Sequence, residues 1–558
     1  MIIVWNVLMK LSLKKEELTN MKKNILIGGV SVVAFLAFVG SIVLLTTGGF
    51  FSNSNVNNND NNNNNNEPPF NEVPQEMGSY SKFTYEDVYK SSLTPVTPSK
   101  GNVNILVVPV EFSDLDSFTT SNLELINYAF NGSNEDNTTS YWESCKSFYY
   151  KSSNGALNFN FEVTDVFVPS ITSTTFNRYA DDYGTESTMI LDEIAAEGLT
   201  INNSSINFND KKYDSNNDGT IDGVWMIYNA TSYLDVYGRQ KYWAYTTNYG
   251  SENPTVPFGK YANGSILFLG ENGQLPRDSK NADAHTIIHE TGHMLGLDDY
   301  YDYCGKNNYS YTGLVDMMDL NIGDHDAFSK HALGWTKSLV VTDERTLTLK
   351  PFATSFDSII LPSGTYNGSA FSEYLIIEYY TPEGLFAHDS ENKYGGLSSS
   401  YPKFFTESGL RIYHIDARLS EFNAKYNMLT HSISYEFGDY LTDTNLTSIP
   451  GYSENMSGTA ASWTEISHTN CPDDSTRNKD GKALITLVSS QNDVLFGRRG
   501  ANNNDLYTKN LSDGYAFSYQ NQNKYFTNGK FNDGSEMNYT ITINGTSEEG
   551  INVTIGRN

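Results

Sequence analysis

The chain of 558 residues is longer than one typical domain, and its 38 tyrosines and 30 phenylalanines provide bulky side chains for a large core. Its formal net charge of −29 argues against a nucleic-acid-binding protein, which needs a basic surface, and fits a soluble extracellular protein that binds calcium. The three cysteines, Cys145, Cys304 and Cys471, are too few for a disulfide scaffold and allow one bridge.

The N-terminal part of the chain is predicted to precede the folded part. Residues 1–24 are interpreted as a cytoplasmic tail or as an extension upstream of a true start at Met21. Residues 25–46 are apolar, follow several lysines and would span roughly 30 Å as a helix. They are interpreted as a signal anchor or a signal peptide, with an uncleaved transmembrane anchor favoured. Residues 47–100 are interpreted as an asparagine-rich disordered linker and lead-in, so the remainder is expected to be extracellular, either secreted or anchored to the cell membrane.

From residue 101 the pattern becomes that of a folded domain. Strands are expected at 103–112, 156–168, 224–228 and 265–269, and helices at 121–130, 141–150, 188–197, 282–295 and 327–335. This mixture predicts a catalytic domain of the α+β class, with α/β as the alternative, over residues 101–337. Further strands are expected at 340–351, 358–361, 374–380, 409–416, 483–489 and 538–555, which predicts a β-rich, sandwich-like region over residues 338–558.

The sequence HETGH at residues 289–293 carries the strongest chemical signal. On a helix, positions i and i+4 lie on one face, so His289 and His293 can both bind one Zn²⁺ at roughly 2.0–2.1 Å. Glu290 lies one position further round the helix, close to the metal but not bound to it. It can therefore act as the general base for a zinc-activated water.

The residues after this motif extend it to H-E-x-x-H-x-x-G-x-x-D. Gly296 can end the helix with a positive φ, and the turned chain can bring Asp299 back as the third zinc ligand. Asp298 and Asp302 are lower-ranked alternatives. His285 lies two turns before His293, about 12 Å along a helix, which is too far for both to bind one ion.

Two further features follow from spacing. Met318, with Met317 as the alternative, is predicted to form a methionine turn below the zinc ligands. The stretch DSNNDGTID resembles a Ca²⁺ loop, but Trp225 stands where an EF-hand needs a glutamate. Its candidate calcium ligands are the oxygen-bearing side chains of Asp214, Asn216, Asp218 and Asp222, and an ion-free Asx-rich turn is the alternative.

Several of these motifs, in the same order over residues 102–416, resemble the immune inhibitor A-type secreted metallopeptidases, which are metzincin-like zincins. The resemblance rests on VNILVVPVEFSD, SFYYKSSNGALNF, YDSNNDGTIDGVWMIYNA, HETGHMLGLDDYYD, KHALGW, SEYLIIEYY and SGLRIYHID. It implies a zincin-like catalytic domain followed by β-rich domains, with zinc, often calcium, and proteins or peptides as substrates. It also implies His289, His293 and Asp299 as zinc ligands and Glu290 as catalytic base. Members commonly have a proline where this chain has Asp298, and a longer pro-segment.

The predicted function is therefore an extracellular zinc-dependent endopeptidase that hydrolyses peptide bonds of proteins. An oxyanion donor is expected among Tyr300, Tyr301, Tyr303 and Tyr311, without a choice between them. The alternative is a non-catalytic cell-surface binding protein or adhesin that uses the same fold as a scaffold. A third interpretation takes a glutamate from a later helix as ligand, which Gly296 and Asp299 disfavour.

Overall fold

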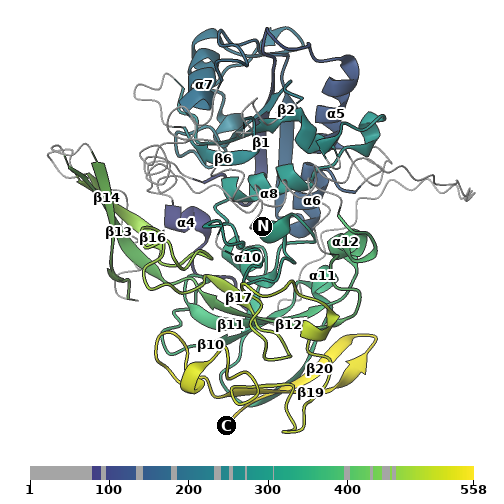
Figure 1. Cartoon of the computed structure of the whole chain (residues 1–558), viewed down its shortest axis with the longest axis vertical. Coiled ribbons are helices and arrows are strands. Elements are labelled where there is room, and N and C mark those ends of the chain that lie inside the picture. Colours follow the sequence, from purple (N-terminus) through teal and green to yellow (C-terminus); the bar gives the residue numbers. More distant parts are fainter. Residues whose placement is uncertain are drawn as a thin grey trace, which may run out of the picture.

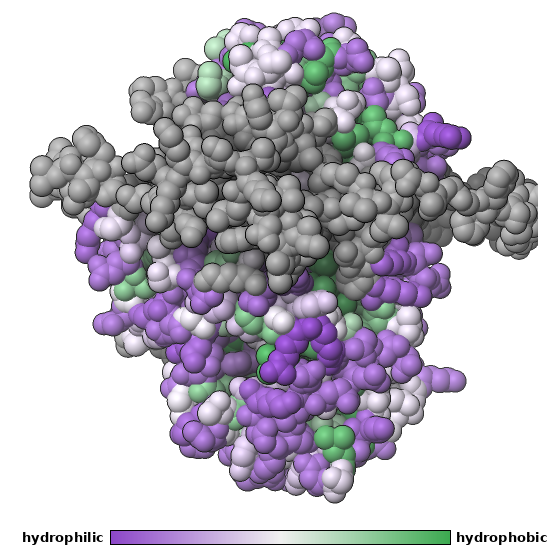
Figure 2. Space-filling view, viewed as in Figure 1, coloured by the Kyte–Doolittle hydropathy of each residue, from purple (hydrophilic) through white to green (hydrophobic). Residues whose placement is uncertain are grey.

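The computed structural model describes residues 78–89, 96–132, 142–176, 185–231, 241–249, 256–270, 273–305, 307–394, 403–427, 432–442, 453–454 and 460–558. Over these residues the fold is mixed α/β, with several sheets and few helices (Figure 1). Among the described residues on the face shown in Figure 2, most of the visible surface is hydrophilic.

The prediction of a transmembrane signal anchor needs correction. In the described part of the chain, no helix combines the length and the apolar character needed to cross a membrane. The predicted span at 25–46, like the rest of residues 1–77, lies outside the described residues.

A five-stranded sheet organises the N-terminal half, in the order β2-β1-β5-β7-β6. β6 lies at one edge and is antiparallel to β7, whereas the other pairs are parallel. Along β1, Val103 and Ile105 join the hydrophobic cluster on one face, and Leu106 and Val108 the cluster on the other. The strands are β1 (Gly101–Val110), β2 (Leu157–Val163), β5 (Val224–Tyr228), β6 (Tyr245–Asn248) and β7 (Lys260–Ser265).

Helices cover both faces of this sheet, which explains why β1 and β5 are buried on both sides (Figure 1). The helices are α5 (Thr120–Asn131), α6 (Cys145–Ser152), α7 (Thr185–Glu197) and α8 (His285–Met294). Residues such as Leu125, Phe148 and Ile287 place α5, α6 and α8 on the Val103 face. Ile190 places α7 on the opposite face.

Two further sheets pack face to face in the C-terminal half. The first has the order β17-β12-β11-β10-β8 and the second β18-β19-β20-β9. Leu375 and Ile377 of β11 share a cluster with Ile541 of β19, while Ile376, on the opposite face of β11, packs toward the helices. The strands are β8 (Ser338–Val340), β10 (Ser358–Pro362), β11 (Glu373–Tyr380), β12 (Gly409–Asp416) and β17 (Ile485–Leu487), with β9 (Arg345–Leu349), β18 (Phe517–Ser518), β19 (Tyr539–Ser547) and β20 (Gly550–Arg557).

The remaining elements are short or peripheral. A four-stranded sheet, β14-β13-β16-β15, projects beside the helix α4 (Figure 1). Its strands are β13 (Leu419–Asn427), β14 (Ser432–Tyr440), β15 (Ser453–Glu454) and β16 (Ala460–Ile466). The others are α4 (Tyr85–Tyr89), the pair β3 (Thr200–Ile201) and β4 (Ser204–Ser205), α9 (Met317–Leu320), α10 (Ala327–Ala332), α11 (Phe352–Ser355) and α12 (Ala387–Glu391).

Most expected elements are confirmed, and β5 and β12 have the expected bounds. The strand expected at 265–269 is wrong. The strand ends at Ser265, whose side chain accepts from the N–H of Leu267 and caps a 3₁₀ helix, Ile266–Leu269. The strand expected at 340–351 is confirmed only over β9, because β8, which ends at Val340, belongs to a different sheet. The stretch at 538–555 is a hairpin, β19–β20, rather than one strand.

The hydrophobic core is continuous across the boundary predicted at residues 337/338. One cluster contains Leu333 and Trp335 from before the boundary and Ile376, Tyr413 and Leu487 from after it. The predicted division into two domains stays a prediction, but the two halves share this core.

A chain that ends at residue 337 is therefore expected to lose cooperative unfolding, because apolar side chains such as Trp335 would face water. Near-ultraviolet circular dichroism during heating should show a sharp transition for residues 78–558 and none for residues 78–337. A sharp transition in the shorter chain would contradict the shared core.

Candidate metal centre

Helix α8 carries the HExxH motif and is bonded to two neighbouring elements of the N-terminal half, β5 and α6. Nine of its ten residues are buried. Trp225 of β5 donates its indole N–H to Thr291 Oγ1 at 3.1 Å, and the Tyr149 hydroxyl of α6 donates to the carbonyl of Ile288 at 2.7 Å. These bonds fix the rotation of the helix and so the direction of its histidines.

Both histidines of the motif have their Nδ1 atoms next to a main-chain carbonyl. His289 Nδ1 lies 2.8 Å from the carbonyl of Met317, and His293 Nδ1 lies 2.7 Å from the carbonyl of Leu297. A carbonyl can only accept, so each Nδ1 donates its proton, and in the neutral, metal-binding form of each ring the lone pair is on Nε2. This is the arrangement in which histidines bind a metal through Nε2.

The two Nε2 atoms meet a carboxylate oxygen of Asp299. The His289 and His293 Nε2 atoms are 3.2 Å apart, and Asp299 Oδ1 lies 3.2 Å from the first and 3.0 Å from the second. Ligands at roughly 2.0–2.1 Å on a tetrahedral ion are separated by about 3.3 Å. Two imidazoles and a carboxylate also form a known donor set of catalytic zinc, so these residues fit a zinc ion.

The turn after α8 brings Asp299 back to the helix. Gly296 has a φ of +103°, and a Cβ atom there would meet the ring of Tyr85 at 3.0 Å, so glycine is required. Asp299 is inside the three-residue group, whereas Asp298 is outside it. Asp302 accepts from the N–H groups of Cys304 and Asn307 instead.

The electrostatics of Asp299 agree with its place at the centre. Burial alone would raise the pKa of its carboxyl, but the charge of His293 and hydrogen bonds from both histidines hold that pKa well below the usual range. For Asp298, burial raises the pKa to about 6 although Arg477 opposes the shift. Asp299 therefore stays ionised to lower pH than Asp298 does.

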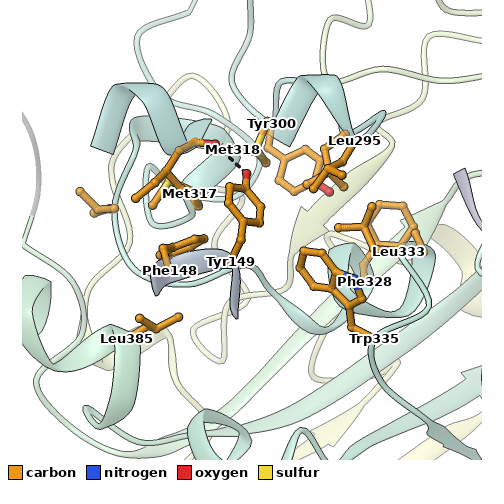
Figure 3. Close-up of a cluster of buried hydrophobic side chains, with 14 of the residues drawn as sticks. Phe148, Tyr149, Leu295, Tyr300, Met317, Met318, Phe328, Leu333, Trp335 and Leu385 are labelled. Atoms are coloured by element: carbon orange, nitrogen blue, oxygen red, sulfur yellow. Dashed lines mark hydrogen bonds between the residues drawn. The ribbon is translucent and has the colours of Figure 1, made fainter. Parts of the chain in front are cut away.

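The methionine turn lies directly under the helix. Met318 begins the turn α9 with Met317, and both are fully buried beside Tyr149, Leu295 and Tyr300 (Figure 3). A Cβ atom at Gly292 would lie 2.6 Å from the Met318 sulfur, so the helix and the turn approach each other as closely as glycine permits. Met318 is thus the methionine that packs under the motif, and the carbonyl of Met317 orients His289.

Glu290 is buried next to the two ligands without joining them. Burial raises the pKa of its carboxyl, while the neighbouring histidines lower it. The hydroxyl of Thr246, on the edge strand β6, lies 2.7 Å from the carbonyl of Glu290 and 3.2 Å from its Oε2. The sequence analysis did not predict a role for Thr246, because the strand of which it is part carries no recognisable motif.

The four candidate tyrosines differ in their surroundings. The hydroxyl of Tyr300 is hydrogen-bonded to that of Ser329 at 2.7 Å, and the hydroxyl of Tyr303 donates to that of Thr469 at 3.0 Å. The ring of Tyr311 stacks on that of Phe496, with ring centroids 3.9 Å apart. The ring of Tyr301 instead lies nearly parallel to that of the candidate ligand His289, with ring centroids 6.3 Å apart. Among the four, Tyr301 is the one whose ring is paired with a candidate ligand.

The candidate calcium loop is folded by hydrogen bonds of its own. Asp214 accepts from the N–H groups of Asp218 and Gly219 at 2.9 and 3.1 Å, and Gly219 has a φ of +90°. Asp222 accepts from the N–H of Ser215, and burial raises the pKa of its carboxyl to about 7. Asn216 binds Asp218 at 3.0 Å. The three carboxylates do not form a metal-binding group in the described structure, and calcium binding stays a prediction.

His285 lies at the other end of α8, away from the centre. Its ring is stacked between Trp142 and Tyr394, at centroid distances of 4.1 and 4.2 Å. Its Nδ1 lies 2.7 Å from Asp283, and its Nε2 lies 3.5 Å from Asp389. Burial lowers the pKa of His285, but the two carboxylates outweigh burial and raise it to about 9.

In comparisons with known proteins, no protein-family model and no curated protein matches the chain. The argument for this centre therefore rests on its geometry and on the chemistry of its donors.

Replacing Asp299 should weaken metal binding far more than replacing Asp298. We expect Asp299→Ala to lower zinc affinity by more than about 100-fold, since even outer-sphere partners of zinc ligands are worth 10- to 100-fold. Competition with a chromophoric chelator measures the affinity, and Asp298→Ala is the matched control. The opposite order of effects would make Asp298 the ligand.

The stability of the fold should depend on the charge of His285. Because its folded-state pKa is raised from 6.5 to about 9, the stabilisation is complete below about pH 6.5 and is lost as the pH rises through 9. The shift corresponds to a loss on the order of 3 kcal/mol in the free energy of unfolding. Denaturant unfolding of the wild type and of His285→Gln between pH 6 and 9.5 tests this. A difference between the two proteins that does not change with pH would refute it.

Proposed function

We propose that the protein is a zinc metalloendopeptidase of the immune inhibitor A type. The observation that carries this proposal is the meeting of His289 Nε2, His293 Nε2 and Asp299 Oδ1 within 3.2 Å of one another, with Glu290 beside them. A zinc ion bound there would supply Lewis-acid activation of a water molecule and of the scissile carbonyl.

The chain's own residues perform the proton transfers. Glu290 accepts the proton of the attacking water and donates it to the leaving amine. Its burial raises the pKa of its carboxyl, so the protonated form that serves as the acid is stabilised. Thr246, within 3.2 Å of Oε2, orients the carboxylate. Tyr301, next to His289, is the proposed donor to the oxyanion.

The substrate we propose is an extended polypeptide. β6 is the outer strand of its sheet among the described residues, and it lies beside α8. An extended peptide that paired with such an edge would run past Glu290, because Thr246 of β6 contacts that residue. Main-chain pairing of this kind accepts many sequences, which suits an endopeptidase acting on proteins.

The layout supports a zincin-like catalytic half. A mainly parallel sheet with an antiparallel edge strand lies against the metal-binding helix, and a methionine turn lies below the ligands. The face-to-face sheets that follow are the proposed sandwich-like accessory region.

We also propose that the protein works outside the cell. Cys304 and Cys471, which are 167 residues apart in sequence, form a disulfide, whereas Cys145 is free and buried. Disulfides of this kind form in oxidising compartments.

Glu290→Gln should separate metal binding from catalysis. We expect zinc content to stay at one ion per chain while kcat/KM for casein falls by at least about 10²-fold, the range that general acid–base groups contribute. Chelation should abolish the wild-type activity. Full activity of Glu290→Gln would refute the mechanism. Bound zinc with no cleavage by the wild type would instead favour a binding role.

A further inference from the structure

A segment of the C-terminal half touches the loop that carries Asp299. We call residues 295–305 the Asp299 loop. Thr469 accepts a hydrogen bond from the Tyr303 hydroxyl at 3.0 Å, and Cys471 is bonded to Cys304. Residues 303 and 304 of the Asp299 loop are thereby bonded to residues 469 and 471, which are far away in sequence.

Asn470, between these two contacts, has a fully buried side chain. Its Nδ2 donates to the carbonyl of Tyr300 at 2.8 Å, and its Oδ1 accepts from the N–H of Ile485 at 3.1 Å. Ile485 is the first residue of β17. A single amide therefore joins the residue after Asp299 to the sheet that contains β17.

The other side of Tyr300 is joined to the methionine turn. Its N–H donates to the carbonyl of Met318 at 2.8 Å, and the neighbouring carbonyl of Met317 accepts from His289. The main chain next to Asp299 is thus held between the turn that orients His289 and the strand that Asn470 reaches. A shift at either end would move the Asp299 carboxylate relative to the imidazoles.

The disulfide holds the far end of the same loop. Cys304 follows Asp299 by five residues, and Cys471 is fully buried next to Asn470. The bridge keeps residue 471 beside the loop, and the Asn470 amide depends on that placement.

We propose that Asn470 and the Cys304–Cys471 disulfide are positioning elements of the metal centre, so that the C-terminal half takes part in holding Asp299 and reduction of the bridge weakens metal binding. The inference rests on the proposed metal centre but not on peptide hydrolysis. According to this inference, the β-rich C-terminal half helps to hold a ligand of the metal centre in place.

Reduction is a thiol–disulfide exchange with a dithiol reductant such as dithiothreitol. One reductant thiolate attacks a sulfur of the bridge and releases one protein thiolate. The second reductant thiolate then closes a cyclic disulfide and releases the other. Two electrons pass to the protein, which gains two thiols after protonation. Cys145 is already a thiol, so the reagent leaves it unchanged.

The test measures metal binding and needs no substrate. Zinc affinity and the visible spectrum of the Co²⁺-loaded protein are measured for the untreated wild type as the reference. They are then measured for three altered forms: the wild type reduced with dithiothreitol, which is removed by desalting before metal is added, the double variant Cys304→Ser/Cys471→Ser, and Asn470→Ala. The cobalt bands report the coordination number, which a general loss of stability does not change. We expect affinity to fall by about 10- to 100-fold and the bands to change in all three altered forms.

Asn229→Ala is the matched control. It removes a buried asparagine whose side chain also binds the main chain: it accepts from the N–H of Phe112 at 2.9 Å and donates to the carbonyls of Asp116 at 2.9 Å and Phe112 at 3.4 Å. This control should keep the wild-type affinity and spectrum.

Hydrogen exchange on the metal-free protein gives a second readout. The amide hydrogen of Tyr300 should lose protection in the reduced protein and in Asn470→Ala, but not in Asn229→Ala. Unchanged zinc affinity, cobalt spectrum and Tyr300 protection after reduction would overturn the inference, even if the protein proves to be a peptidase. Bound zinc that responds to reduction, in a protein that cleaves nothing, would support the inference while the proposed hydrolysis failed.

Discussion

The Nδ1 atoms of His289 and His293 each donate to a main-chain carbonyl, and these two hydrogen bonds decide where the opposite nitrogens point. One carbonyl belongs to Met317 in the methionine turn, and the other belongs to Leu297, just past the end of α8. Both lone pairs are then aimed at one place, 3.2 Å apart in a buried setting. Such an arrangement needs a cation or a proton between the rings, because two lone pairs repel each other. The turns around the helix are therefore as necessary to the centre as the motif itself.

The methionine turn is stable because polar side chains satisfy its main chain. Asp316 accepts from the N–H of Met318 at 2.8 Å, and Asp319 accepts from the hydroxyls of Ser310 and Thr312 and from the N–H of Leu314. Burial raises the pKa of Asp319 to about 6, against the effect of these bonds. Among the described residues, Asp316 Oδ2 and Asp319 Oδ1 are buried without a hydrogen-bond partner, so the bonds to the other oxygen of each carboxylate are what offsets the cost of burying these acids.

The chemical residues of the site could be predicted from the sequence, whereas the contacts that orient them could not. His289, Glu290, His293 and Asp299 follow one another at spacings that a helix and a turn convert directly into geometry. Thr246 and Asn470 reach the site through the pairing of strands and through tertiary packing, which leave no local pattern. The same limit explains the errors in the fold.

The errors in the fold have local causes that a window of sequence does not contain. The apolar run at 265–269 has the composition of a strand, but Ser265 caps a 3₁₀ helix there. The strand expected at 340–351 was too long, because β8 ends at Val340 and pairs with β10, whereas β9 pairs with β20, so the chain changes sheets between them. The strand at 224–228 was predictable because burial on both faces leaves an uninterrupted apolar run, VWMIY. At 409–416 the apolar residues are interrupted by Arg411 and His414, but they still dominate the middle of the strand.

Charges of both signs surround the centre in the described part of the structure. Asp298 interacts with Arg477 and Glu465, and Lys260 at the start of β7 interacts with Glu465 and Asp298. Arg477 lies over the ring of Tyr303, 5.2 Å from its centroid. A site lined by one sign would concentrate substrates of the opposite charge. Opposed charges cancel much of that field, which favours the proposed recognition by main-chain pairing at β6 over selection by the charge of the substrate.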